Sequence, residues 1–275
     1  MASTMTANLE IISTGNELLI GKIENTNAFW IAKRATQLGV TVKRITVIQD
    51  IVPEIASTIN EAVARKPQFI VTTGGLGPTF DDKTLQAVAK ALNRPLIVNQ
   101  QALSMVKRAL QRYALKRGLN TEIELTLSRI KMATLPQGTE PVNNPIGAAP
   151  AVRAAFEETI LFALPGVPAE MEAIFKETIA PLLKQATCGN VFCQQSIFVE
   201  GTVESCLDSI VEKVMADNKG VYVKSHQLQS EGKPRIELHL TMIDSRDQNP
   251  AQRIRKAAGE LASLIKEKGG QVCIE

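Results

Sequence analysis

The stretch VTTGGLGPTFDDKT (Val71–Thr84) places three glycines, a proline and two adjacent aspartates directly after the end of an apolar run, FIVTT (Phe69–Thr73). Such a run is typical of a buried strand. The glycines remove side chains where the backbone must turn sharply. Helical spacing follows at Leu85, Val88, Ala89 and Leu92. We predict a strand, a glycine-rich turn and a helix, with Thr79 as the helix N-cap and Asp82 as its capping-box-like partner.

The same alternation of strand and helix extends to both sides of this stretch. Further strands are expected at residues 9–14, 40–48 and 158–164. Helices are expected after Asn25 and Thr26, from Pro53, across residues 99–118, and after Pro168 with a bend near Pro181. The last of these has an apolar face made of Met171, Ile174, Phe175, Ile179 and Leu182. Near-continuous apolar strands joined by helices predict an α/β domain with a doubly wound, mostly parallel sheet.

A change of pattern near residue 187 predicts a second domain, so we place the domains at residues 1–187 and 188–275. The second reads as strand, helix, two strands, helix and strand, which predicts a small two-layer α+β unit. Its clearest strand, RIELHLTMI, alternates strictly between apolar and polar side chains. The apolar positions are Ile236, Leu238, Leu240 and Met242.

Composition limits the classes of function. Of 275 residues, 44% are hydrophobic, 21% charged and 4% aromatic, as in an ordinary water-soluble domain. The formal charge is only +3 and the basic residues are scattered, so we expect neither a nucleic-acid partner nor a membrane surface. The first ten residues lack an apolar leader, which favours a cytoplasmic protein. The four cysteines form no C-x-x-C pair, so a zinc site is not expected.

The glycine-rich turn predicts a phosphate site, because free N–H groups and the positive end of a helix dipole attract anions. It matches neither G-x-x-x-x-G-K-[ST] nor G-x-G-x-x-G. Asp81 and Asp82 would repel a phosphate unless a divalent cation lay between them, so a magnesium site is one interpretation. The other is that both carboxylates only cap the helix. Residues alone leave the two open.

Other polar residues carry similar alternatives. Asn16 and Glu17 follow the first strand and share the rim of the sheet with the glycine turn, where they could hold a metal or ribose hydroxyls, or simply form a turn. Glu170 begins a helix, where the dipole alone favours a carboxylate. His239 lies on the polar side of its strand and should be exposed, whereas His226, near Lys224 at a strand end, has no such simple explanation.

Four motifs, taken together and in order, resemble the N-terminal region of the competence/damage-inducible protein A (CinA) family, which has a MoaB/Mog-type molybdopterin-binding fold. They are GNELLIGKIENTNAFWIAKRATQLG, TTGGLGPTFDDKT, LPQGTEPVNNPIGAAP and LPGVPAEM. The likeness covers about residues 8 to 185. In the second unit VEGTVES resembles the family's small KH-like domain.

The resemblance implies a metal-dependent pyrophosphatase acting on ADP-ribose-like or FAD-like dinucleotides, and a homodimer. Asp81 and Asp82 would hold Mg²⁺, Mn²⁺ or Co²⁺ and serve in catalysis, together with Glu204 and Lys224 from the small domain. Phosphoanhydride hydrolysis needs such a cation, donors for the phosphate oxygens and a positioned water. The implied ligand-binding residues are Glu17, Asn25, Gly74, Gly75, Gly77, Pro78, Thr79, Asn144 and Gly147.

The chain departs from the family pattern at three positions. Many relatives have Asp, Thr and Gly where this chain has Asn16, Ala148 and Ala151, and these losses bear on substrate preference. Longer relatives also carry a nicotinamide mononucleotide deamidase domain, so deamidation is not expected of a chain ending at Glu275. Two alternatives to hydrolysis remain: a molybdopterin or pterin-phosphate-binding protein of molybdenum-cofactor assembly, and a nucleotide sensor that binds without turnover.

Overall fold

The computed structural model describes residues 7–118, 124–228, 235–245 and 248–274. The chain divides into two compact units, which are treated separately below. Unit 1 takes in residues 1–36 and 40–186, and unit 2 takes in residues 37–39 and 187–275. The main division therefore falls one residue before the predicted boundary. No helix of the described residues is long and apolar enough to cross a membrane.

Unit 1 is built on a six-stranded sheet in the order β2-β1-β3-β8-β7-β6. Strand β1 pairs in parallel with β2 and β3, and β3 pairs in parallel with β8. All five residues of β3 are buried, as expected for a strand covered on both faces. The predicted mostly parallel α/β fold is confirmed. The bounds of these four strands are Asn8–Thr14 (β1), Thr41–Ile48 (β2), Phe69–Thr73 (β3) and Thr159–Leu164 (β8).

The antiparallel edge of this sheet was not predicted. Strands β7 (Ala151–Phe156) and β6 (Glu140–Val142) pair antiparallel with their neighbours. Three of the six residues of β7 are alanines, which have low strand propensity, so the segment gives little local signal. Strands β4 (Leu96–Val98) and β5 (Thr134–Pro136) form a separate two-stranded sheet.

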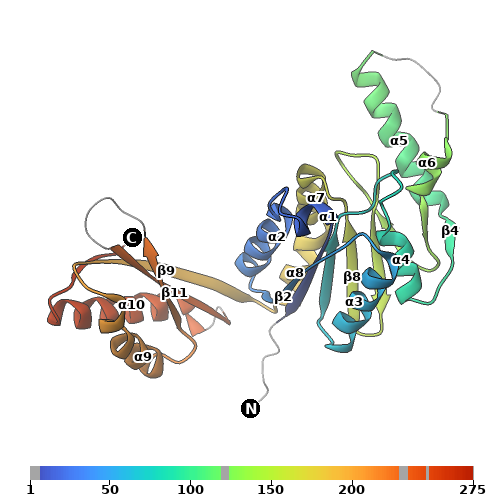
Figure 1. The fold of residues 1–275 in the computed structure, drawn as a ribbon. Coiled ribbons are helices and arrows are strands. Elements are labelled where there is room, and N and C mark those ends of the chain that lie inside the picture. The colour runs from blue at the N-terminus through green and yellow to red at the C-terminus, as the bar shows by residue number, and fades with distance from the viewer. Residues whose placement is uncertain (1–6, 119–123, 229–234, 246–247, 275) are drawn as a thin grey trace. The chain divides into compact units, whose positions relative to one another are not determined.

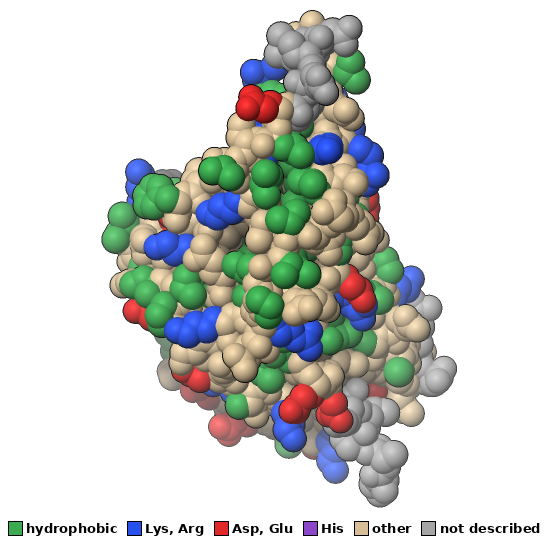
Figure 2. Space-filling view, turned by 90° about the vertical axis from the view of Figure 1, so that its right-hand side faces the viewer, with side chains coloured by type: hydrophobic (Ala, Val, Ile, Leu, Met, Phe, Trp, Pro, Cys, Tyr) green, Lys and Arg blue, Asp and Glu red, His purple; other side chains and the backbone are tan. Residues whose placement is uncertain are grey.

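Helices cover both faces of the sheet, with α2, α7 and α8 on one face and α3 and α4 on the other (Figure 1). The core on the α3 and α4 face includes Ile12, Ile59, Ile70, Val88 and Leu161, each at most 1% exposed. Hydrophobic side chains are also exposed on the surface over α5, α6 and β4 (Figure 2). Leu115 on α5 and Leu127 on α6 are among the exposed hydrophobic residues. The bounds are Asn16–Leu19 (α1), Thr26–Gln37 (α2), Val52–Ala64 (α3), Thr84–Ala91 (α4), Gln100–Lys116 (α5), Leu127–Lys131 (α6), Pro168–Ile174 (α7) and Ala180–Ala186 (α8).

A π-helical turn, Phe175–Ile179, joins α7 to α8 where a bend was predicted. Pro181 has no N–H to donate to the carbonyl of Glu177, and its ring would clash with that carbonyl in a regular helix. A π-turn adds one residue to the helical register. The fully buried side chain here is Leu183, which is 0% exposed, whereas Leu182, predicted for this face, is only half-buried.

Unit 2 contains a four-stranded antiparallel sheet in the order β10-β11-β9-β12, and its elements follow the predicted order. The alternation predicted for β11 is confirmed, since Ile236, Leu238, Leu240 and Met242 are at most 2% exposed. The apolar spacing of Val203, Leu207, Ile210, Val211 and Val214 predicts one helical face, but Val203 is 57% exposed, so the buried face begins at Leu207. The bounds are Asn190–Glu200 (β9), Asp208–Asp217 (α9), Tyr222–Leu228 (β10), Arg235–Ser245 (β11), Pro250–Glu267 (α10) and Gln271–Ile274 (β12), with a 3-10 turn at Glu204–Cys206.

An ion pair between a buried carboxylate and a more exposed guanidinium ties β1 to the end of α3. The Glu10 side chain is 5% exposed, and Arg65 donates to both of its oxygens, from Nε at 2.9 Å and Nη2 at 2.6 Å. The hydrogen bond with Glu10 raises the pKa of Arg65 above its usual value. Because the carboxylate is buried, loss of the guanidinium would leave its charge without compensation.

We expect Arg65→Met to lower the free energy of unfolding of unit 1 by about 2 to 4 kcal/mol, since it strands the charge of Glu10. The fluorescence of Trp30, the chain's single tryptophan, reports this transition in a denaturant titration. The matched control is Glu140→Gln, which breaks a more exposed pair with Arg153 at 2.8 Å and should cost less than about 1 kcal/mol. Equal losses for the two variants would contradict the prediction.

Candidate functional site

A cavity of about 720 Å³ opens at the carboxyl ends of the parallel strands of unit 1. Its walls include Gly15 and Glu17 after β1, Gly74–Gly77 after β3, and Pro165–Pro168 after β8. Parallel sheets bind ligands at this edge, because the loops that follow their strands converge there. The two polar loops predicted to share one rim do so.

The glycine loop is pressed between β1 and α4. Gly74 and Gly75 have φ angles of 106° and 69°, in the left-handed region. A Cβ atom on Gly74 would lie 2.5 Å from the carbonyl oxygen of Thr14, and one on Gly75 would lie 2.4 Å from Thr84 Oγ1. The Thr84 hydroxyl also donates to the Gly74 carbonyl oxygen at 2.8 Å. Both positions therefore require glycine whatever the ligand.

Three successive backbone N–H groups of this loop lack partners. Gly74 N–H donates to the carbonyl oxygen of Leu164 at 3.0 Å. The next three, those of Gly75, Leu76 and Gly77, make no hydrogen bond within the part of the chain that the structure describes, and all three residues line the cavity. Buried N–H groups are almost always paired, and successive free ones form anion-binding concavities. The loop therefore has the donors that a phosphate needs.

The residues after the glycines form a tight turn rather than a helix cap. Thr79 Oγ1 donates to the carboxylates of Asp81 and Asp82, and Asp82 Oδ2 accepts from Thr79 N–H at 2.8 Å. Helix α4 begins only at Thr84, so Thr79 as its N-cap is wrong. The reason is tertiary: the carbonyl oxygen of Gly75 accepts from Thr84 N–H at 3.1 Å and fixes the helix start there.

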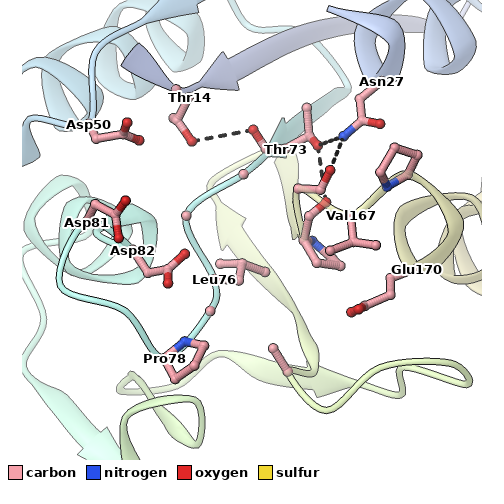
Figure 3. A pocket seen from close by; sticks show the side chains of 18 of the residues that line it. Thr14, Asn27, Asp50, Thr73, Leu76, Pro78, Asp81, Asp82, Val167 and Glu170 are labelled. Atoms are coloured by element: carbon pink, nitrogen blue, oxygen red, sulfur yellow. Dashed lines mark hydrogen bonds between the residues drawn. The ribbon is translucent and has the colours of Figure 1, made fainter. Parts of the chain in front are cut away.

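Asp81 and Asp82 both line the cavity, although their carboxylates also accept hydrogen bonds from Thr79. The hydroxyl of Thr79 lowers the pKa of Asp81 below its usual value, which favours the charged form. Asp50, which the sequence analysis missed, lies beside them; Figure 3 shows these three carboxylates on one side of the cavity and Glu170 on the other. Asp50 follows β2, so the rule that selected the loops after β1 and β3 would have found it.

Asp50 is held in place by the backbone of the first loop. Asn16 N–H donates to Asp50 Oδ2 at 3.0 Å. Burial raises the pKa of Asp50 above its usual value, and the neighbouring charges of Glu17 and Asp81 raise it further. The side chain of Asn16, where relatives have Asp, is exposed and does not belong to the cavity wall. Ala148 does line the wall.

Three of the predicted ligand-binding residues do not line the cavity but support residues that do. Thr79 holds the turn described above. Asn144 is 4% exposed; its Nδ2 donates to the Ala149 carbonyl oxygen at 2.9 Å and to Glu170 Oε2 at 2.6 Å, and its Oδ1 accepts from Ile146 and Gly147. A Cβ atom on Gly147 would lie 2.0 Å from Glu170 Oε2. Asn144 and Gly147 therefore position Glu170, which does line the cavity.

Asn25, which lines the cavity, caps α2, because its Oδ1 accepts from Ala28 N–H at 3.2 Å. Asn27 was missed. Its Nδ2 donates to Thr73 Oγ1 at 2.9 Å and to the Gly166 carbonyl oxygen at 2.8 Å, while its buried Oδ1 has no partner in the structure as described. The predicted glycines and Pro78 also lie in the wall.

Of the two site residues predicted in unit 2, Glu204 has hydrogen-bond partners within that unit. Glu204 accepts from Ser225 Oγ and, at 3.0 Å, from Gln227 Nε2. These bonds lower the pKa of Glu204 below its usual value. Lys224 stands opposite His239 in the β10–β11 ladder, and the rings of His239 and His226 are 6.4 Å apart. His239 is half-buried, whereas the sequence suggested exposure, because its Nε2 lies 3.3 Å from Gln194 Oε1 on β9.

The charge of the cavity wall is strongly unbalanced. Arg129 is the single Lys or Arg among the described residues that line it. The acidic residues of the wall are Glu17, Glu24, Asp50, Asp81, Asp82 and Glu170. Among the residues described, no three His, Cys, Asp or Glu side chains are grouped so as to hold a metal ion. Mg²⁺ is commonly held by one or two carboxylates together with the phosphates of a ligand, and the oxygen donors present fit that pattern.

Comparison with known proteins places the chain in a family. The family model described as "Probable molybdopterin binding domain" matches residues 10–185. A protein of Aeropyrum pernix is 41% identical over 266 residues, which is 96% of each chain. A protein of Caldivirga maquilingensis is 41% identical over 265 residues, 96% of this chain and 98% of the relative. Neither name states a function.

One crystal structure is similar at the level of both sequence and fold. It is that of "the protein CinA with unknown function" from Thermoplasma acidophilum, with a TM-score of 0.57 and 36% identity, covering 64% of this chain and 98% of the other. This match confirms the resemblance to CinA predicted from the motifs. The family match over residues 10–185 and the two full-length relatives show that the chain belongs to the probable molybdopterin binding domain family.

Proposed function

We propose that unit 1 binds a molybdopterin-type pterin phosphate in this cavity, as a binding protein of molybdenum-cofactor assembly. The observation that carries the proposal is the run of three unpartnered amides at Gly75, Leu76 and Gly77. These are the donors that would take the phosphate. Membership of a family described by molybdopterin binding supports the choice of the pterin.

The remainder of the wall suits the ring of such a ligand. A volume of about 720 Å³ lies within the range for small-molecule sites. The buried Oδ1 of Asn27 has no partner in the structure as described, and a buried acceptor without a donor is unfavourable. Asn27 lines the cavity, so a pterin ring bound there would lie beside its amide.

A divalent cation fits the same proposal. A phosphate at the glycine loop would lie beside Asp50, Asp81 and Asp82, and the repulsion requires compensation. Asp81 and Asp82 are the residues that would hold the cation together with phosphate oxygens of the ligand, whose charge the cation would neutralise. Burial raises the pKa of Asp50, and the neighbouring charges of Glu17 and Asp81 raise it further, as expected where carboxylates lie close together.

A second candidate function is hydrolysis of a phosphoanhydride bond, as in ADP-ribose or FAD. It is favoured by the position of Asp81 and Asp82 beside phosphate-binding amides, because this reaction needs a cation at the bridging and terminal oxygens. A nucleotide sensor would show the same binding without turnover. The homodimer and the roles of Glu204 and Lys224 remain predictions.

We expect Mg²⁺ to strengthen binding of a phosphorylated pterin to the wild-type chain. Without Mg²⁺, Asp81→Asn should bind about three- to tenfold more tightly than wild type, since one repulsive charge is gone, and Mg²⁺ should then help it less. Titration by pterin fluorescence measures both effects.

Glu158→Gln is the matched control, because it removes one exposed carboxylate at the turn before β8, at the opposite end of the sheet from the cavity. It should bind as wild type does with and without Mg²⁺. Failure of wild type to bind any phosphorylated pterin with or without Mg²⁺ would refute the proposed function.

If the site hydrolyses dinucleotides, purified protein with Mg²⁺, Mn²⁺ or Co²⁺ releases AMP from ADP-ribose, and Asp82→Asn slows release by about 100-fold or more. Chromatographic detection of AMP provides the measurement, again with Glu158→Gln as control. Ligand recovered intact after long incubation with each metal would remove the hydrolase and leave binding.

Asp50 gives the site a pH-dependent stability. Its folded-state pKa is raised, so the protonated form fits the fold better, and stability is lost as pH rises from below the unfolded value through the raised one. Asp50→Asn keeps an acceptor for Asn16 N–H without the charge. We expect its melting temperature to exceed that of wild type at pH 7.5, with a smaller difference at pH 4.5 or with Mg²⁺ added. A difference that grows toward acid pH would contradict this sign.

A further inference from the structure

Helix α6 brings the one basic side chain of the wall to the cavity. Arg129 is half-buried, and its Nη1 donates to the carbonyl oxygen of Glu124. It forms no ion pair with any described residue, although six carboxylates line the same cavity. A guanidinium has five N–H donors, so most of its donors are left for another group.

A second cation of α6 lies on the other side of the glycine loop. Lys131 Nζ donates to the Thr79 carbonyl oxygen, which attaches α6 to the turn that carries Asp81 and Asp82. Lys131 lines a separate cavity of about 300 Å³, and Gly75, Leu76 and Gly77 line both cavities. The loop is thus a partition, with Arg129 facing the large cavity and Lys131 facing the small one.

These positions assign different tasks to the two residues. Lys131 is committed to the backbone of the turn. Arg129 has unused donors, no acidic partner in the described chain, and a place in the wall of the cavity that contains the free amides. A half-buried charge is stabilised by an opposite charge, and a guanidinium matches a phosphate in a two-pronged geometry.

We propose that Arg129 contacts the anionic group of the ligand directly and sets the preference for phosphorylated over unphosphorylated ligands. This rests on the proposed binding site, but it is independent of whether the rest of the ligand is a pterin. In this largely acidic cavity, Arg129 and the three backbone amides would bind the phosphate oxygens, and the carboxylates would bind the divalent cation.

The experiment uses inorganic pyrophosphate with Mg²⁺ as the probe, measured by calorimetry on the full chain. Arg129→Gln should weaken binding about 10- to 100-fold, because a charged hydrogen-bonding partner is lost. Arg129→Lys should bind pyrophosphate more tightly than Arg129→Gln but less tightly than wild type, since an ammonium lacks the planar fork of a guanidinium. Arg108→Gln is the control, as it removes one exposed charge from α5 outside this cavity and should bind as wild type does.

Wild-type affinity in Arg129→Gln, or no pyrophosphate binding by the wild type, would overturn the proposal. The proposal would also be overturned if Arg129→Gln lost affinity equally for a phosphorylated pterin and for its dephosphorylated form and its melting temperature fell. That result would indicate a purely structural role. Arg129-dependent pyrophosphate binding without any pterin binding would instead reject the proposed function and leave the role of Arg129 standing.

Discussion

The structure of the site depends on the close approach of the loop after β3 to the carbonyl group of Thr14 and the hydroxyl group of Thr84. The missing side chains at Gly74 and Gly75 allow this approach, and the hydroxyl of Thr84 fastens it. Because Thr84 is hydrogen-bonded to the loop and is also the first residue of α4, the loop is fastened to the start of this helix. The free amides are therefore held in place before any ligand arrives, which lowers the entropic cost of binding.

The wall around this rigid loop is chemically divided. Acidic side chains reach it from the ends of β1 and β2, from the turn after the glycines and from α7, whereas its donors for anions come from backbone amides and from α6. A ligand with phosphate alone would meet too much negative charge, and a cation alone would leave the amides without partners. The division favours a ligand that brings phosphate and cation together, in either candidate function.

Local patterns predicted the parallel strands, the alternation in β11 and the loops that share the rim. They failed where distant contacts decide the outcome. Thr79 and Asp82 have the spacing of a capping box, but the bond from Thr84 N–H to the Gly75 carbonyl oxygen moves the helix start. Asn144 was predicted to bind the ligand, but its side-chain amide donates to Glu170, 26 residues away in the sequence. Arg129 carries no sequence signal at all, because only the folding of α6 over the loop brings it to the cavity.

The π-turn between α7 and α8 has a consequence for how this unit can change in evolution. The helical segments before and after the π-turn have different surroundings. Helix α7 places Glu170 in the cavity wall, and α8 places Leu183 in the core. Removing one residue from the turn would rotate everything downstream by roughly 100° relative to α7. An insertion or deletion within the turn would therefore change which side chains of α8 are buried, whereas Glu170 on α7 would keep its place at the cavity.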